Sequence, residues 1–162
     1  MSKLIQSLSK IIENTNYITL GRVEMKKDKL QLAGCVILNE KGEILLLHRN
    51  TAVRKQWEIP GGKIENGETN KGAAIREIGE ELGIRVNILR ILGHNDFVED
   101  GLIMGYTWLL AEIKSGVPKI IEKDKFDNLR YFSWRKLKGI LKDLSPNTHN
   151  LVEAYFRREI SL

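Results

Sequence analysis

The feature that most constrains this chain is a crowd of carboxylates between residues 61 and 84. The stretch runs GGKIENGETNKGAAIREIGEELGI, and Glu77, Glu80 and Glu81 stand three and four residues apart within it. On a helix, at about 100° per residue, they share one face, where like charges repel and destabilise the helix. A sequence that keeps them indicates a compensating cation, and carboxylate oxygens are ligands that suit Mg²⁺ or Mn²⁺.

The same stretch predicts its own helix. Thr69 can cap the helix with its hydroxyl, and apolar residues recur at every fourth position from Ala74 to Leu82. Gly83 follows at a position where helices commonly stop. We therefore predict a helix over residues 70–82. A solvated acidic face is the alternative explanation of its three glutamates.

The whole stretch resembles the Nudix box, G-x5-E-x7-R-E-U-x-E-E-x-G-U, in which U is apolar. The match runs over 23 residues from Gly62 to Ile84, and every fixed position of the motif is present. The flanking sequence also resembles the family, from about Lys29 to the C-terminus. By this resemblance the chain is identified as a Nudix hydrolase.

The resemblance implies a metal site. Glu77, Glu80 and Glu81 match the family's metal-binding glutamates, and the carbonyl of Gly61 often joins them. Glu68 matches a glutamate that supports the site, often through water. The cation expected there is Mg²⁺, with Mn²⁺ as the alternative.

The resemblance also implies a catalytic set. Arg76 matches an arginine that braces the carboxylates, and a guanidinium can hold a carboxylate in a bidentate pair. A base must take the proton of the attacking water, and the family varies in which carboxylate does so. Glu77 is the first candidate and Glu122 the second, with Glu99 third, while Glu80 completes the set. A solvated loop acid is the alternative for Glu122 and Glu99.

Signals outside the box make the chain look like the MutT-type branch, which hydrolyses nucleoside triphosphates to monophosphate and pyrophosphate. Asn147 opens the last helix where that branch can carry a base-reading asparagine, and it could present a donor and an acceptor to a purine. Arg49 and Arg54 are candidates for phosphate or base contacts. Ile59 stands near the expected base, where a phenylalanine is often seen.

Other functions stay open at this point. ADP-ribose and the 5′-triphosphate end of RNA are the alternative substrates, and clearance of oxidised nucleotides is one form of the MutT-type activity. A protein of another class, a nucleotide-sensing module without catalysis, would keep the fold, but the intact box argues against it.

Composition bears on the size, the charge and the cellular compartment of the protein. A chain of 162 residues is long enough for one domain with a core, and its net charge of +5 fits attraction to polyphosphates only weakly. Its single cysteine, Cys35, excludes an intrachain disulfide and suits a reducing cytoplasm. No apolar stretch approaches a membrane span. We expect a cytoplasmic protein that binds a small nucleotide, with no membrane and no nucleic-acid partner, and we leave a homodimer open.

The order of elements predicts an α+β fold, which the resemblance makes a Nudix-like α/β/α sandwich with a mixed β-sheet, a box helix and a C-terminal helix. Residues 1–28 are predicted to be a helical extension and strand packed on the domain, with a dimer contact as the alternative for the helix. Residues 29–162 are predicted to be the Nudix domain. Within it we expect strands at 30–38, 44–48, 86–92, 102–113 and 130–134, a hairpin turn at 39–43, a loop or strand end at 94–101, and helices at 135–144 and from Pro146 to about Ile160.

Overall fold

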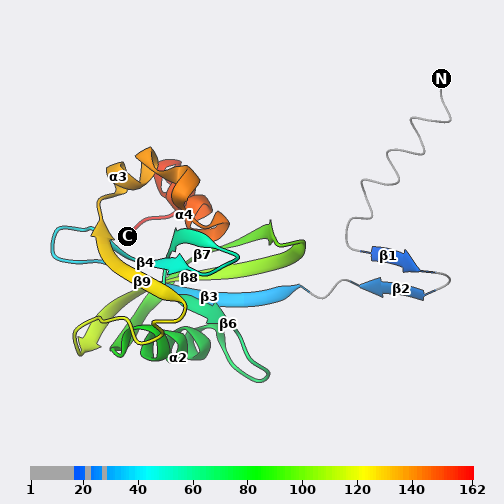
Figure 1. Ribbon diagram of the computed structural model, residues 1–162, viewed down its shortest axis with the longest axis horizontal. Coiled ribbons are helices and arrows are strands. Elements are labelled where there is room, and N and C mark those ends of the chain that lie inside the picture. The colour runs from blue at the N-terminus through cyan, green and yellow to red at the C-terminus, as the bar shows by residue number, and fades with distance from the viewer. Residues whose placement is uncertain (1–16, 21–22, 27–28) are drawn as a thin grey trace.

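The computed structural model of the chain describes residues 17–20, 23–26 and 29–162 (Figure 1). Its strands there are β1 (Tyr17–Leu20), β2 (Val23–Lys26), β3 (Leu30–Ile37), β4 (Ile44–Asn50), β5 (Lys55–Glu58), β6 (Gly61–Lys63), β7 (Arg85–Glu99), β8 (Leu102–Ser115) and β9 (Phe126–Phe132). Its helices there are α2 (Asn70–Leu82), α3 (Trp134–Gly139) and α4 (Pro146–Phe156), with a 3-10 turn at Leu141–Asp143. The helix predicted within residues 1–16 lies outside the described residues, so its packing stays a prediction.

The strands of the Nudix-like region form two sheets between layers of helix. One sheet has the order β6-β3-β8-β7 and the other β5-β4-β9, while β1 and β2 pair with each other. β3 and β8 are parallel, and the remaining pairings are antiparallel. Figure 1 shows α2 on one side of the strands and α3 and α4 on the other. This arrangement confirms the predicted α+β sandwich. In the described part of the chain, no helix is long and apolar enough to cross a membrane.

The core lies in two layers because β3 and β4 are buried on both faces. Alternate side chains of these strands enter opposite apolar clusters, one under α3 and α4 and the other under α2. The first cluster takes Val36, Ile44 and Leu46, and the second takes Cys35, Ile37, Leu45 and Leu47. Each fully buried Leu or Ile contributes about 1.5–3 kcal/mol. Burial on both faces explains the apolar runs at 32–37 in β3 and 44–47 in β4.

The turn between β3 and β4 forms as predicted, but the two strands do not form a hairpin. Gly42 has a φ of 70° and its N–H donates to the Asn39 carbonyl at 2.9 Å. Beyond it a single bridge joins Leu38 to Ile44, and the strands then enter different sheets. The prediction of a hairpin was wrong because β6 and β8 occupy both edges of β3.

The box helix forms where the sequence predicts it. The Thr69 hydroxyl accepts the Gly72 N–H at 3.1 Å, and Gly83 ends the helix with a φ of 65°. Its predicted apolar positions, from Ala74 to Leu82, are buried against β3. Of the three glutamates, Glu81 is buried with them, while the Glu80 side chain is exposed.

Two strands begin or end far from their predicted bounds. β7 continues through the polar residues 94–99, which pair with β8, and the chain turns only at Asp100 and Gly101 with φ of 51° and 74°. β9 begins at Phe126 rather than Arg130. Pairing with a neighbour satisfies the backbone of these polar segments, so their composition misled the loop predictions.

The C-terminal helices are shorter than predicted. α3 stops at Gly139 and the chain continues as a 3-10 turn. α4 stops at Phe156, because Arg158 takes a φ of 61° and the N–H of Glu159 donates back to the Ala154 carbonyl at 2.9 Å. These bonds form a Schellman-type stop, which returns Ile160 to the core.

Candidate active site

Two glycines bring the start of β6 against the box helix. Gly61 has a φ of 147°, and a Cβ there would lie 2.4 Å from the Cα of Gly34. A Cβ at Gly62 would lie 2.5 Å from the carboxyl carbon of Glu77. A side chain at either position would therefore push β6 away from its neighbours. The close approach lets the Gly61 N–H donate to Oε2 of Glu81 at 2.9 Å.

Glu81 is a buried carboxylate. Its side chain is 3% exposed and, within the described residues, has no ion-pair partner. Burial raises the pKa of Glu81 well above its usual range, and the negative charges of Glu58, Glu77 and Glu122 raise it further. A buried carboxylate is costly in its ionised form unless a cation accompanies it. This position therefore fits a cation that the described residues do not supply.

Arg76 gathers three carboxylates in front of the helix. Its Nε and Nη2 bond Glu68 at 2.8 and 3.0 Å, and its Nη1 lies 2.9 Å from Glu77 and 3.2 Å from Glu80. Its Nη2 also donates to the Lys63 carbonyl at 3.0 Å. The guanidinium therefore lies where it can hold these three carboxylates in a fixed orientation.

The Glu68–Arg76 pair should make stability depend on pH. The hydrogen bond from Arg76 lowers the pKa of Glu68 from 4.5 to about 2. A carboxyl whose pKa is lowered by folding stabilises the fold above its unfolded pKa, and that contribution is lost as pH falls through the folded pKa. We therefore expect wild type to be more stable than Glu68→Gln at pH 7, with the difference shrinking between about pH 4.5 and about pH 2.

Thermal unfolding followed by circular dichroism at a series of pH values measures this difference. Glu65→Gln is the matched control, because Glu65 is an exposed glutamate at a variable position of the same motif. A stability difference that stays constant from pH 7 to about pH 2 would contradict the ion pair.

The carboxylates fit a divalent ion, although Arg76 bonds three of them, Glu68, Glu77 and Glu80. Among the residues that the structure describes, no three His, Cys, Asp or Glu side chains stand close enough to hold a metal as they lie. Burial raises the pKa of Glu77, as it does that of Glu81. Two such carboxylates beside a glycine backbone are a hard-oxygen donor set suited to Mg²⁺ or Mn²⁺. The residues that could hold the ion are those predicted from the sequence: Gly61, Glu68, Glu77, Glu80 and Glu81.

The loop before β9 is fastened to the C-terminal end of the box helix. The N–H groups of Lys119 and Ile121 donate to the carbonyls of Leu82 and Glu81 at 3.1 and 2.9 Å. This docking brings Glu122 to the carboxylates, so that its charge acts on Glu81. The fold therefore places the second candidate base beside the box.

A pocket of about 280 Å³ opens beside the carboxylates. It brings together all the predicted substrate residues, Arg49, Arg54, Ile59 and Asn147, with Gly61 and Gly62 at the box. Its apolar lining comes from Leu30, Leu32, Phe97, Leu102 and Met104. A separate groove of about 310 Å³ lies between β7 and α4 and includes no box residue. The pocket, rather than the groove, therefore adjoins the chemistry.

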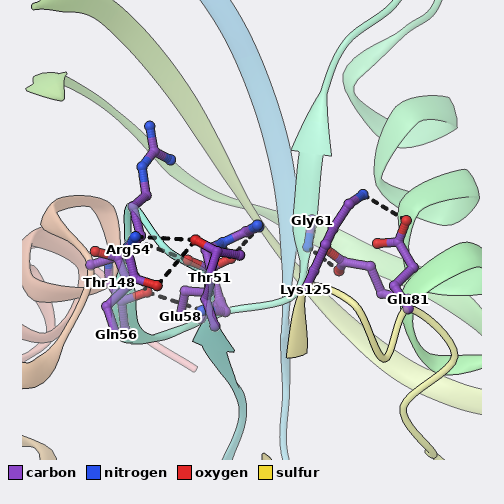
Figure 2. Close-up of polar contacts among 12 residues, drawn as sticks. Thr51, Arg54, Gln56, Glu58, Gly61, Glu81, Lys125 and Thr148 are labelled. Carbon is purple, nitrogen blue, oxygen red and sulfur yellow. Dashed lines mark hydrogen bonds and ion pairs between the residues drawn. The ribbon is translucent and has the colours of Figure 1, made fainter. Parts of the chain in front are cut away.

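Both arginines of the pocket already have carboxylate partners. Nε and Nη2 of Arg49 bond Glu58 at 2.9 and 2.7 Å. Nη1 of Arg54 lies 3.1 Å from Glu99, and its guanidinium also pairs with Asp100 in the β7–β8 turn. Figure 2 shows Arg54 and Glu58 on the same side of the close-up, away from Glu81. Contact of either arginine with a ligand stays a prediction, since a ligand would compete with these pairs.

Asn147 holds a fixed orientation at the start of α4. It is buried, and its Oδ1 accepts the indole N–H of Trp108 at 2.7 Å. Because an indole only donates, the amide oxygen must face Trp108, which leaves the NH₂ group for a ligand. The Ile59 N–H donates to Oγ1 of Thr148 at 3.0 Å. This bond holds the start of α4 against Ile59, which lines the pocket.

Sequence reasoning missed several partners of the site. Lys125, whose Nζ lies 2.6 Å from Oε1 of Glu122, was not predicted, although its i,i+3 spacing was visible. Glu58 had no assigned role before it was found on Arg49. The Trp108–Asn147 bond spans 39 positions, and no local pattern could have indicated it.

Comparison with known proteins gives the site a context. The sequence pattern of the NUDIX domain matches residues 29–155. Diphosphoinositol polyphosphate phosphohydrolase 3-beta of Bos taurus is 29% identical over 133 residues, which are 80% of this chain and 77% of that protein. The 8-oxo-dGTP diphosphatase of Escherichia coli (strain K12) is 47% identical over 58 residues, 35% of this chain and 45% of that protein. A crystal structure of a MutT NUDIX hydrolase from Burkholderia pseudomallei has a TM-score of 0.66 at 29% identity, covering 78% of this chain and 97% of that one.

Proposed function

This chain belongs to the NUDIX family of pyrophosphohydrolases, in its MutT-like branch, and from that premise we propose that it hydrolyses a nucleoside triphosphate to the monophosphate and pyrophosphate. The observation that carries the proposal is the pocket that borders Gly61 and Gly62 and is lined by Asn147. Apolar side chains together with the fixed amide of Asn147 suit a nucleobase. The likeness to an 8-oxo-dGTP diphosphatase supports an oxidised purine as one such base.

The pocket lining favours a base over the substrate named for the bovine relative. A diphosphoinositol polyphosphate carries many phosphate charges, and each needs cationic or hydrogen-bond partners. The two arginines of the pocket are paired with Glu58 and Glu99, and much of the remaining wall is apolar. A flat, uncharged ring therefore suits this cavity better.

The carboxylates of the box account for metal binding. A divalent ion at the box would offset phosphate charge and make its bound water more acidic. We assign its binding to Gly61, Glu77, Glu80 and Glu81, with Glu68 in support. Arg76 keeps these carboxylates oriented through its hydrogen bonds.

Glu77 remains the first candidate for the general base. Burial raises its pKa, which moves a carboxylate toward the working pH of an acid–base catalyst. Glu122 is the second candidate, because its loop docks on the box helix. Glu99 is less suited, since it lies in the pocket wall and pairs with Arg54.

Replacing Asn147 with aspartate should alter base preference without removing the bond to Trp108. An aspartate oxygen can still accept the indole N–H, but the NH₂ donor is gone and a negative charge replaces it. We expect kcat/KM to fall by about tenfold for bases that offer an acceptor to this amide, such as guanine or 8-oxoguanine. Steady-state kinetics with the four dNTPs and 8-oxo-dGTP measures the change.

Asn147→Ala is the companion variant. It removes both groups and leaves the buried Trp108 N–H without its acceptor, so its thermal stability should fall below that of wild type. An equal loss of kcat/KM across all bases in the aspartate variant would contradict a base-reading role.

The substrate proposal is tested by a panel with product identification. The panel contains canonical and oxidised (d)NTPs, ADP-ribose, a diphosphoinositol polyphosphate and 5′-triphosphorylated RNA, each with Mg²⁺ or Mn²⁺. We expect the highest kcat/KM with a (d)NTP and release of pyrophosphate. A clear preference for ADP-ribose or for the RNA end would replace the proposal with one of its alternatives.

A further inference from the structure

The carboxylate site contains a second cation besides Arg76. Lys125 follows the Glu122 loop, and its ammonium lies 2.6 Å from Oε1 of Glu122. The charges of Glu81 and Arg49 also act on it. In Figure 2 the Lys125 side chain extends on the Glu81 side of the close-up. The Lys125 ammonium therefore interacts with the carboxylates of the site.

The backbone of Lys125 is fixed while its side chain is less constrained. The Asn50 N–H donates to the Lys125 carbonyl at 2.9 Å, and the N–H groups of Lys125 and Phe126 donate to the Glu122 carbonyl at 3.1 and 3.0 Å. The side chain is 43% exposed and has one ion-pair partner in the described residues. The ammonium can thus change partner without moving the loop.

The two cations differ in how firmly the site holds them. Arg76 is bound by three carboxylates and a carbonyl. Among the described residues Lys125 pairs with Glu122 alone, and a lysine ammonium is a compact charge on a flexible stem. When a divalent cation enters beside Glu122 and Glu81, repulsion between like charges disfavours the ammonium at its present position.

We propose that Lys125 is an exchangeable cation of the active site. It neutralises Glu122 while the carboxylates have no divalent ion, competes with that ion, and contacts the phosphates of the nucleotide once the ion has displaced it. The second part rests on the proposed nucleotide substrate. The first part concerns this chain and a metal ion alone.

Lys125→Met tests the competition without any substrate. Methionine keeps an unbranched side chain and removes the charge, so Glu122 loses the cation that competes with a metal. We expect the variant to bind Mn²⁺ about two- to fivefold more tightly than wild type, the range of one exposed ion pair. Electron paramagnetic resonance of free Mn²⁺ during titration measures the Kd. Lys123→Met is the matched control, because Lys123 is exposed on the same loop.

The same variants test the phosphate contact. With the preferred (d)NTP at saturating Mg²⁺, we expect Lys125→Met to raise KM by about tenfold, with a smaller change in kcat. Lys125→Arg keeps the charge and should restore KM toward the wild-type value. A merely structural role would not produce tighter Mn²⁺ binding together with a higher KM.

Either of two results would overturn the proposal. One is a Mn²⁺ affinity or a KM in Lys125→Met that equals the wild-type value or changes in the opposite direction. The other is an equal change in Lys123→Met. Because the Mn²⁺ titration needs no nucleotide, a wrong substrate assignment would appear in the substrate panel and not in this measurement.

Discussion

Replacing Glu80 with glutamine is expected to lower kcat by about a thousandfold or more while leaving the fold intact. Glutamine keeps the shape of the side chain but removes the negative charge that a divalent ion needs. The Glu80 side chain is 53% exposed, and its bond to Arg76 is an i,i+4 surface pair. Losing that pair should cost no more than about 0.5 kcal/mol of stability. A large loss of turnover would therefore report chemistry rather than unfolding.

Steady-state kinetics at saturating Mg²⁺ and thermal unfolding of the same preparation measure the two effects together. Glu65→Gln is the control, as an exposed glutamate outside the fixed positions of the motif. Near-normal turnover in Glu80→Gln would remove Glu80 from the metal site. A fall in Tm of more than a few degrees would show that the variant had damaged the fold.

The parts of the site that lie on one helix could be predicted from the sequence. Arg76 and Glu80 are four residues apart and Glu77 and Glu80 are three apart, so helical spacing brings each of these pairs to one face. Thr69 and Gly83 delimit the helix through bonds that stay within it or at its ends. Local geometry was sufficient for this part of the prediction, including the position of the brace.

The parts that depend on how distant segments dock could not be predicted. β3 pairs with β8 and not with β4. Because β4 and β8 are both apolar strands, their sequences do not indicate which of them joins the sheet of β3. Lys125 reaches the site because its loop docks on the carbonyls of Leu82 and Glu81. The orientation of Asn147 in α4 depends on Trp108, a residue of β8. A single sequence contains no periodic signal for any of these contacts.

Glu81→Gln is expected to have two opposite effects, because the requirements of stability and of metal binding conflict at this residue. Turnover should fall by about a hundredfold or more, since the buried carboxylate charge is lost. In EDTA, however, the variant should be more stable than wild type. Glutamine can still accept the Gly61 N–H through its oxygen, and it removes a buried carboxylate that has no cation in the described residues.

The pH dependence of this stability difference follows from the pKa of Glu81. Burial raises that pKa well above 4.5, so folding disfavours the ionised form. The resulting penalty on wild type is absent below about pH 4.5 and grows as pH rises toward the folded pKa. The advantage of Glu81→Gln in EDTA should therefore be small near pH 4.5 and larger at pH 8, with about 2–4 °C in Tm for each kcal/mol relieved.

Differential scanning fluorimetry in EDTA and in Mn²⁺ measures the Tm of wild type and variant without and with a bound metal ion. Mn²⁺ should raise the Tm of wild type, because it binds the folded state, and should raise that of Glu81→Gln much less. Glu80→Gln is the control, since its side chain is exposed and its replacement relieves no buried charge. If Glu81→Gln were less stable than wild type in EDTA at pH 8, the burial of an uncompensated charge would be the wrong account of this residue. If it were more stable and still responded fully to Mn²⁺, Glu81 would not be a metal ligand.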